Sequence, residues 1–217
     1  MDRSGSFVRF LRCVPNGHGR SGAPYPGEVT ASRPLPAPLP RVLVVCTGNV
    51  CRSPYAEHRL RALVTGLEVT SRGIDALVGA PMDPPMAQLL AGHGTTAASF
   101  RARQLTAADL DADLVLTMSA RQRSVLLEEF PAAARRTGLL GTVPQLERLV
   151  EEHGALTPAA VAAWSRRAVP PDRDVPDPYR RGEETARAVA TLLDTHVELL
   201  ADLLTRDADG APAPTPS

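Results

Sequence analysis

The chain has 217 residues, of which 43% are hydrophobic and 22% charged, a composition that indicates a folded globular protein with one core. Its 24 basic and 24 acidic residues cancel, which argues against a nucleic-acid partner. Arginine supplies all of the basic residues and lysine is absent, so chemistry that depends on lysine is excluded, including the nucleotide-binding loop that ends in Gly-Lys-Ser/Thr.

The cysteine content indicates a reducing compartment. Cys13, Cys46 and Cys51 are too few, and odd in number, for a disulfide scaffold. No apolar run reaches the length of a membrane span. Near the N-terminus, the short apolar patch Phe7–Leu11 is interrupted by Arg9 and does not form a signal-peptide core. We therefore expect a cytoplasmic protein without a membrane partner.

Composition divides the chain into three parts. Residues 1–39 are rich in Pro, Gly and Arg without periodicity, which predicts a flexible extension. Residues 207–217 carry alternating prolines and predict a disordered tail. The residues between them, 40–206, are expected to form one domain.

Within that domain, strand and helix patterns alternate. Val42–Val45 is a continuous apolar run typical of a buried strand, and a helix is expected from Pro54 to Leu63 with Ser53 as its N-cap. Further strands are expected at 67–71, 114–118 and 137–140, and further helices from 86, from 120 to 130, and at 143–153, 158–167 and 183–204. This order predicts an α/β fold with a parallel sheet covered on both faces, and places the site in the loop after Val45.

Cys46 and Arg52 stand at the two ends of that loop, with five residues between them. The intervening N–H groups can point inward as a nest for a tetrahedral oxyanion, and the next helix adds its positive N-terminal end. Arg52 adds a planar charged fork that suits two phosphate oxygens. The candidate phosphate-binding residues beside Arg52 are Thr47, Gly48, Asn49, Val50, Cys51 and Ser53.

The same arrangement favours the thiolate form of Cys46, because inward amides, the helix end and Arg52 all stabilise negative charge. A thiolate in a phosphate cradle is a nucleophile directed at phosphorus. Ser53 can donate its hydroxyl to the sulfur and stabilise it as a leaving group. Gly48 and Asn49 are the residue types that most readily adopt the left-handed backbone of a tight loop.

Two other interpretations of the cysteines are weaker. Cys46 and Cys51 can be half of a metal site, but a second cysteine pair is missing and the histidines are scattered, at His18, His58, His93, His153 and His196. Cys46 can also be a buried thiol at the end of a strand. The conjunction of buried strand, Cys, Gly-Asn turn, Arg and Ser-Pro helix start favours phosphate chemistry with neither metal nor cofactor.

The stretch from Val44 to Glu57, Val-Val-Cys-Thr-Gly-Asn-Val-Cys-Arg-Ser-Pro-Tyr-Ala-Glu, resembles the signature of bacterial low-molecular-weight protein tyrosine phosphatases. The resemblance runs from about Val42 to Leu204 and includes Ser71-Arg72-Gly73, Ala102-Arg103-Gln104-Leu105, Asp113-Leu114-Val115-Leu116-Thr117-Met118 and Asp177-Pro178-Tyr179. It implies a four-stranded parallel sheet flanked by helices, with the phosphate-binding loop after the first strand. It also implies hydrolysis of phosphotyrosine without a metal.

The resemblance assigns roles to the catalytic residues. Cys46 would attack phosphorus and form a phosphocysteine, and Asp177 would protonate the leaving phenolate and later accept a proton from water. The residues alone do not choose among Asp172, Asp174 and Asp177 as the acid, and the Asp-Pro-Tyr match selects Asp177. Arg52 would hold the equatorial phosphate oxygens.

The resemblance further implies that Asn49, Ser53 and Ser71 form a hydrogen-bonded net that fixes the loop. Family members often add a His to this net, and the matching position here is Phe100, so we expect a smaller net. Cys51 matches a family residue that can form a reversible disulfide with the nucleophile. The alternative for Cys51, a small buried residue, carries equal weight.

Substrate-facing positions also follow from the resemblance. Tyr179 is expected to line the cleft and stack on the phenyl ring. Leu77 stands where eukaryotic members carry an aromatic wall, and an aliphatic residue there resembles bacterial members that act on tyrosine-rich tails of tyrosine kinases. The expected partner of this monomer is therefore a tyrosine-phosphorylated protein, such as a bacterial tyrosine kinase or its substrates. Residues 156–167, with Trp164, are extra to the family core and are expected to be a solvated helix with one anchoring aromatic.

Three competing functions were weighed. Arsenate reduction by an internal cysteine relay is excluded because no cysteine follows Cys51, although a version with an external thiol stays open. A non-catalytic phosphate-binding module is disfavoured by the presence of Cys46, Arg52 and Asp177 together. A Cys-His hydrolase is disfavoured because no histidine is placed to pair with Cys46.

Overall fold

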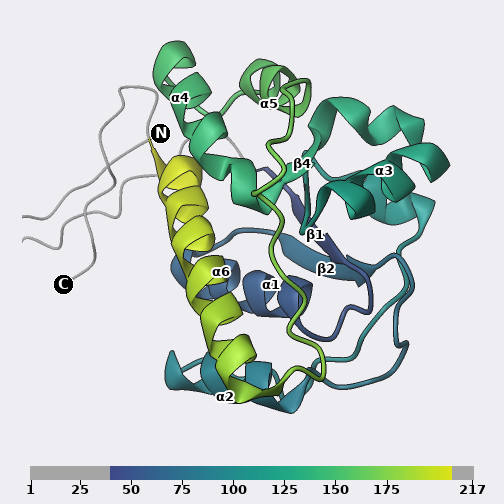
Figure 1. Cartoon of the computed structure of the whole chain (residues 1–217). Helices are drawn as coiled ribbons and strands as arrows, with labels where there is room; N and C mark the ends of the chain where they lie inside the picture. The colour runs from purple at the N-terminus through teal and green to yellow at the C-terminus, as the bar shows by residue number, and fades with distance from the viewer. Residues whose placement is uncertain (1–39, 207–217) are drawn as a thin grey trace, which may run out of the picture. The chain divides into compact units, whose positions relative to one another are not determined.

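A computed structural model describes residues 40–206 (Figure 1). The predicted extension at 1–39 and the predicted tail at 207–217 lie outside the described residues. Four parallel strands form one sheet in the order β2-β1-β3-β4, which confirms the expected sheet. The strands are β1 (Val42–Cys46), β2 (Val69–Gly73), β3 (Leu114–Thr117) and β4 (Thr137–Leu139).

Helices connect and cover the strands. They are α1 (Arg52–Leu63), α2 (Pro84–Gly92), α3 (Ala120–Glu129), α4 (Val143–His153), α5 (Pro158–Ser165) and α6 (Gly182–Thr205). Short 3-10 segments lie at η1 (Ala107–Leu110), η2 (Pro131–Arg136) and η3 (Leu140–Thr142). None of the helices in the described part of the chain is long and apolar enough to cross a membrane.

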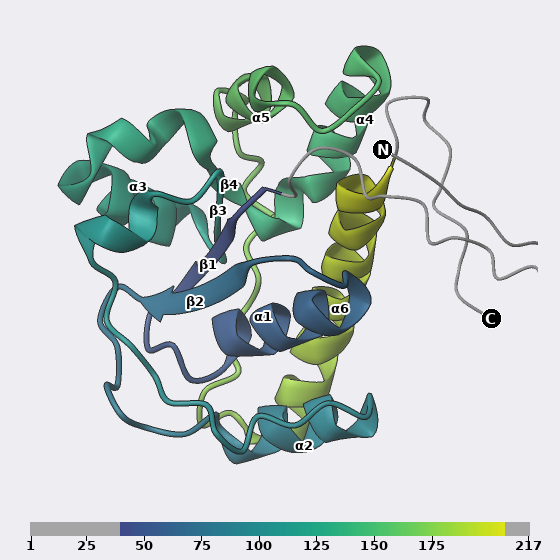
Figure 2. The ribbon, with the colours of Figure 1, turned by 180° about the vertical axis from the view of Figure 1, so that it is seen from behind.

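The central strand β1 contributes to a hydrophobic core on each face of the sheet. Val42 and Val44 belong to a large cluster with side chains of α1, α2, α4, α5 and α6. Leu43 and Val45 belong to a smaller cluster with side chains of η1, α3 and η2. This division follows from the alternation of side chains along a strand, and Figures 1 and 2 show the two helical layers from opposite sides. Both faces are therefore covered, as predicted.

The start of α1 differs from the prediction. The helix begins at Arg52 with Cys51 at the N-cap, and no side chain caps it. Ser53 is therefore not the N-cap, because its hydroxyl lies 3.0 Å from the sulfur of Cys46. At the start of α3, by contrast, the side chain of Ser119 caps the helix by accepting the N–H of Gln122 at 3.2 Å.

Helix α5, in the segment predicted to be extra to the family core, packs on the sheet. Trp164 is buried, and its indole N–H lies 3.1 Å from both the carbonyl and the hydroxyl oxygen of Thr142. Its ring lies directly against Gly138 of the outer strand β4. The anchoring aromatic is as expected, but the expected solvated helix is wrong, because half of the residues of α5 are buried and Ala160 and Val161 join the core beside Trp164.

Gly138→Ala should destabilise the protein, because a Cβ at this position would overlap the ring of Trp164, which is fixed by its hydrogen bonds. We expect the free energy of unfolding to fall by about 1–3 kcal/mol, measured by urea denaturation. The matched control is Gly92→Ala at the end of α2, where nothing lies within 4 Å of the new Cβ. Equal stability of the two variants would contradict the packing of α5 on β4.

Candidate active site

The loop between β1 and α1 turns its carbonyl groups outward. Four of them accept hydrogen bonds from backbone N–H groups of the segment that follows β2. The pairs, donor first, are Ile74 with Cys46, Asp75 with Thr47, Leu77 with Gly48, and Asp83 with Val50, at 2.8–3.0 Å. Because a trans peptide directs its C=O and the next N–H to opposite sides, the N–H groups that follow these carbonyls face the inside of the loop. They form a nest of donors suited to an oxyanion.

Arg52 closes the nest. Its side chain is 6% exposed, and it donates to the carbonyl of Val175 at 3.0 Å and pairs with Asp177 at 2.9 Å. Its Nε atom is buried and has no hydrogen-bond partner among residues 40–206. A buried donor without a partner is costly, so this atom is suited to an oxygen of a bound anion.

The sulfur of Cys46 lies next to a directed chain of hydrogen bonds. Asn49 donates from its side-chain amide to the hydroxyls of Ser53, at 3.0 Å, and Ser71, at 2.9 Å. The hydroxyl of Ser53 therefore has its own hydrogen left to donate, and the Cys46 sulfur at 3.0 Å is closer than its other acceptor, the Arg72 carbonyl at 3.4 Å. A hydroxyl aimed at the sulfur stabilises its thiolate form.

The backbone of Asn49 is also special. It has φ of 54°, in the left-handed region that asparagine tolerates better than most residues. Its side-chain oxygen accepts the N–H of Arg103 at 2.8 Å, so the one amide group ties the loop to two further segments. The predicted net of Asn49, Ser53 and Ser71 is present.

The net is larger than expected. Ser71 donates its hydroxyl to the buried carboxylate of Glu57 at 2.5 Å, and Arg61 pairs with the same carboxylate at 2.6 Å. Phe100 takes no part in the net and packs edge-on against His58. The net lacks a histidine, as predicted, and extends instead to the buried carboxylate of Glu57, whose partner Arg61 is half exposed. No sequence signal that we used connects Glu57 to Ser71.

The three candidate acids lie in different surroundings. Asp174 accepts the N–H of Ala120 at 2.8 Å and so serves the start of α3. Asp172 is largely exposed, 3.6 Å from Arg173. Asp177 lies against Arg52 and lines the same cleft as Cys46. The geometry thus agrees with the choice of Asp177.

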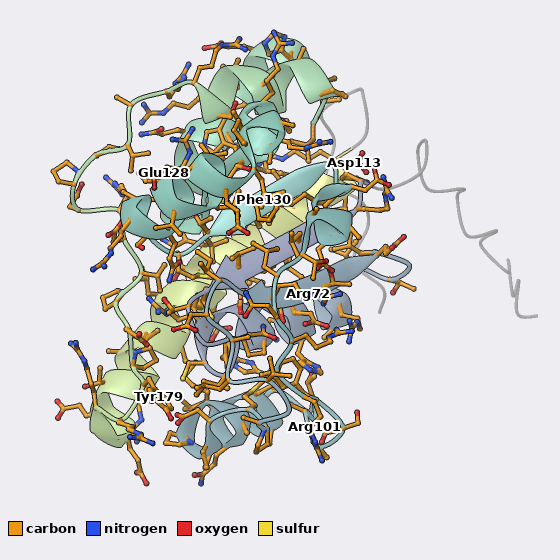
Figure 3. All side chains as sticks on the ribbon, turned by 90° about the vertical axis from the view of Figure 1, so that its right-hand side faces the viewer. Arg72, Arg101, Asp113, Glu128, Phe130 and Tyr179 are labelled. Carbon is orange, nitrogen blue, oxygen red and sulfur yellow. The ribbon has the colours of Figure 1, made fainter. Side chains whose placement is uncertain are left out.

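The cleft above the loop has a volume of about 180 Å³. Its lining includes the predicted residues Cys46, Thr47, Gly48, Val50, Cys51, Arg52, Leu77, Asp177 and Tyr179. Asn49 and Ser53 lie fully buried beneath it. Leu77 is 43% exposed on one wall, and the Arg180 side chain lies over the Tyr179 ring, 5.0 Å from its centroid. Figure 3 shows Tyr179 at the surface.

Two residues near the reaction centre were missed from the sequence. Asp75 lines the cleft, and its position just after β2 is a signal that could have found it. Gln122 of α3 donates to the hydroxyl of Thr47 at 3.0 Å and accepts the N–H of Met118 at 2.9 Å. Nothing in the spacing of the chain predicts that contact.

Cys46 and Cys51 differ in their chemical surroundings. Both are buried and neither forms a disulfide. Burial, with the nearby Asp83 carboxylate and Cys46, raises the pKa of Cys51 far above its usual value, so Cys51 is a neutral thiol. It therefore does not compete with Cys46 as a nucleophile. The reversible disulfide stays a prediction.

Comparison with known proteins identifies the family of this chain. A family profile described as "Low molecular weight phosphotyrosine protein phosphatase" matches residues 41–149. The chain belongs to the low molecular weight phosphotyrosine protein phosphatase family. The low molecular weight protein-tyrosine-phosphatase Wzb of Salmonella typhi is 34% identical over 155 residues, which cover 71% of this chain and 87% of that protein.

Solved structures of the family share the fold. Vibrio vulnificus Wzb in complex with benzylphosphonate is 27% identical with a TM-score of 0.60, over 75% of this chain and 97% of that one. The YwlE arginine phosphatase of Geobacillus stearothermophilus is 30% identical with a TM-score of 0.59, over 75% of this chain and 90% of that one. The phosphatase fold thus occurs with different substrates, and the cleft of each member has to be considered by itself.

Replacing Asn49 should weaken the loop in two separable ways. Asn49→Gly keeps the left-handed backbone and removes the net, so we expect the free energy of unfolding to fall by about 1–3 kcal/mol. Asn49→Ala adds the backbone penalty of about 1–2 kcal/mol on top. Both variants should also lose kcat on an aryl phosphate, and urea denaturation with steady-state kinetics measures the effects. Full activity of Asn49→Gly would show that the net does not position the nucleophile.

Proposed function

We propose that residues 40–206 carry a protein-tyrosine phosphatase that works through a phosphocysteine at Cys46. The observation that carries this proposal is the inward-facing nest of N–H groups with the unpartnered Nε of Arg52, placed next to the Cys46 sulfur in one cleft. The nest and Arg52 supply fixed charge complementarity for the equatorial oxygens of a phosphoryl group in transfer.

In the first step, the thiolate of Cys46 attacks phosphorus while the bond from phosphorus to the phenolic oxygen breaks. Asp177 donates its proton to that oxygen, so the products are a phenol, the Asp177 carboxylate and a phosphocysteine. The guanidinium of Arg52 contacts Asp177 and also faces the nest, so one side chain sets the distance between acid and phosphate site.

In the second step, a water molecule attacks phosphorus and gives a proton to the Asp177 carboxylate. The bond from phosphorus to sulfur breaks, and the thiolate of Cys46 leaves with inorganic phosphate as the other product. The hydroxyl of Ser53, 3.0 Å from the sulfur, stabilises the departing thiolate.

The cleft walls support an aryl substrate. Val50, Leu77 and Tyr179 of the cleft lining present apolar and aromatic surface to the group that carries the phosphate. Asp75, in the same cleft, is the one feature that would suit a cationic phosphoarginine. We infer that the apolar walls determine the preference between these two substrates, and that phosphotyrosine is the better substrate.

The proposed partner is a tyrosine-phosphorylated protein, with a bacterial tyrosine kinase or its substrates as the specific candidates. The exposed side chains of Leu77 and Val78 at the rim, 43% and 69% accessible, offer contact to residues that flank the phosphotyrosine. We propose the cytoplasm as its compartment, because a reducing environment keeps Cys46 able to attack.

Cys46→Ser should abolish hydrolysis of a phosphotyrosine peptide, with kcat lowered about 10³-fold or more, because the nucleophile is lost. The wild type should be insensitive to a metal chelator. Cys13→Ser, outside the described residues, is the matched control and should retain activity. Faster release of phosphate from a phosphoarginine peptide, or arsenate reduction with an added thiol in place of phosphatase activity, would refute the proposed substrate.

Asp177→Asn should slow substrates according to their leaving groups. We expect kcat/KM, which reports the first step without the later hydrolysis of the phosphocysteine, to fall about 10²-fold or more on phenyl phosphate. The loss on p-nitrophenyl phosphate should be much smaller, because its phenolate needs no proton. Asp172→Asn, in the same segment, is the control and should leave both rates near wild type. Equal losses on the two substrates would remove Asp177 from the role of acid.

A further inference from the structure

A second cavity, of about 690 Å³, lies between η2 and α5. Asp113, just before β3, and Arg136, just before β4, both line it, so it sits at the amino ends of these strands. The loop with Cys46 follows the carboxyl end of β1 instead. Figure 3 shows Asp113 of this cavity at the upper right and Tyr179 of the active-site cleft at the lower left.

Arginine dominates the charge of this cavity. Arg135 and Arg136 come from the end of η2, and Arg166 follows α5. The single lining carboxylate, Asp113, already accepts the backbone N–H of Arg41 at 2.8 Å and lies 3.7 Å from its side chain. Within residues 40–206, no hydrogen bond or ion pair engages the three lining guanidinium groups.

Among the lining residues, Arg136 gives the strongest indication that the cavity binds a ligand. Its Nε atom is buried and has no hydrogen-bond partner in the described part of the chain. The other guanidinium nitrogen in this condition is the Nε of Arg52, which closes the phosphate nest of the active site. A buried donor of this kind is satisfied when an anionic oxygen enters, and a guanidinium is the group best shaped to bind phosphate.

We propose that this cavity binds a small molecule with at least two phosphate groups on a compact organic body, the class to which nucleoside diphosphates belong. Three arginines against one carboxylate leave an excess of two positive charges for the phosphates. The volume lies within the usual range of small-molecule sites, about 300–1,000 Å³. Apolar side chains, including Ala132 and Val161, form the rest of the lining and suit the organic part of the ligand.

ADP is the probe that tests the proposal. It is titrated calorimetrically into the full chain, with the active-site cleft saturated by benzylphosphonate so that only the second cavity is open to it. We expect saturable binding of a single ADP per chain. The double variant Arg135→Gln/Arg166→Gln should weaken the affinity about tenfold or more, since two charge-assisted contacts are lost.

A charge-matched control separates the site from general electrostatics. Arg101→Gln/Arg187→Gln removes two exposed arginines outside the cavity and should bind ADP as the wild type does. All four side chains are exposed, so both doubles should fold, which thermal unfolding checks. Absence of ADP binding with the cleft blocked, equal loss in both doubles, or adenosine binding as tightly as ADP would overturn the proposal. None of these readouts depends on phosphatase activity.

Discussion

The guanidinium of Arg52 joins two segments that are far apart in the sequence. It reaches from the start of α1 to the carbonyl of Val175 and the carboxylate of Asp177. A buried charge is tolerated only where partners compensate it, so the position of this side chain and that of the Asp177 segment depend on each other. The proposed nucleophile, phosphate clamp and acid meet in one cleft because the same cation contacts both sides of it.

The rigidity of the loop has a separate origin. Its carbonyl groups are bound from outside, so its N–H groups have to face inward, and Asn49 fixes the remaining freedom through its left-handed backbone and its side-chain amide. The hydrogen-bond chain ends in the Glu57–Arg61 pair and not in a histidine. The Glu57 carboxylate accepts the hydroxyl hydrogen of Ser71, so Ser71 accepts a hydrogen from the Asn49 amide. The same amide also donates to Ser53, which therefore keeps its own hydrogen for the sulfur of Cys46.

Much of the fold and of the chemistry of the loop could be predicted from the sequence alone. The phosphate cradle is built from contiguous residues: the apolar strand β1, the loop from Cys46 to Arg52 and the helix that follows. Its geometry could therefore be predicted from the spacing along the chain. The alternation of strands and helices predicted the parallel sheet, because parallel neighbours require crossover helices. The predicted helix boundary at Ser53 was wrong because its hydroxyl contacts the sulfur of Cys46 and does not cap the helix.

Contacts between distant segments were decided only by the tertiary structure. Asp174 and Asp177 belong to one short segment, but Asp174 accepts the N–H of Ala120 whereas Asp177 contacts Arg52. The burial of Trp164 against Gly138 and the arginine-lined cavity likewise join η2, β4 and α5. Residue patterns specify what a side chain can bind, whereas long-range packing specifies which partner is within reach. For this chain, the chemistry of the loop was therefore local, whereas the contact between Arg52 and Asp177 and the second cavity came from long-range packing.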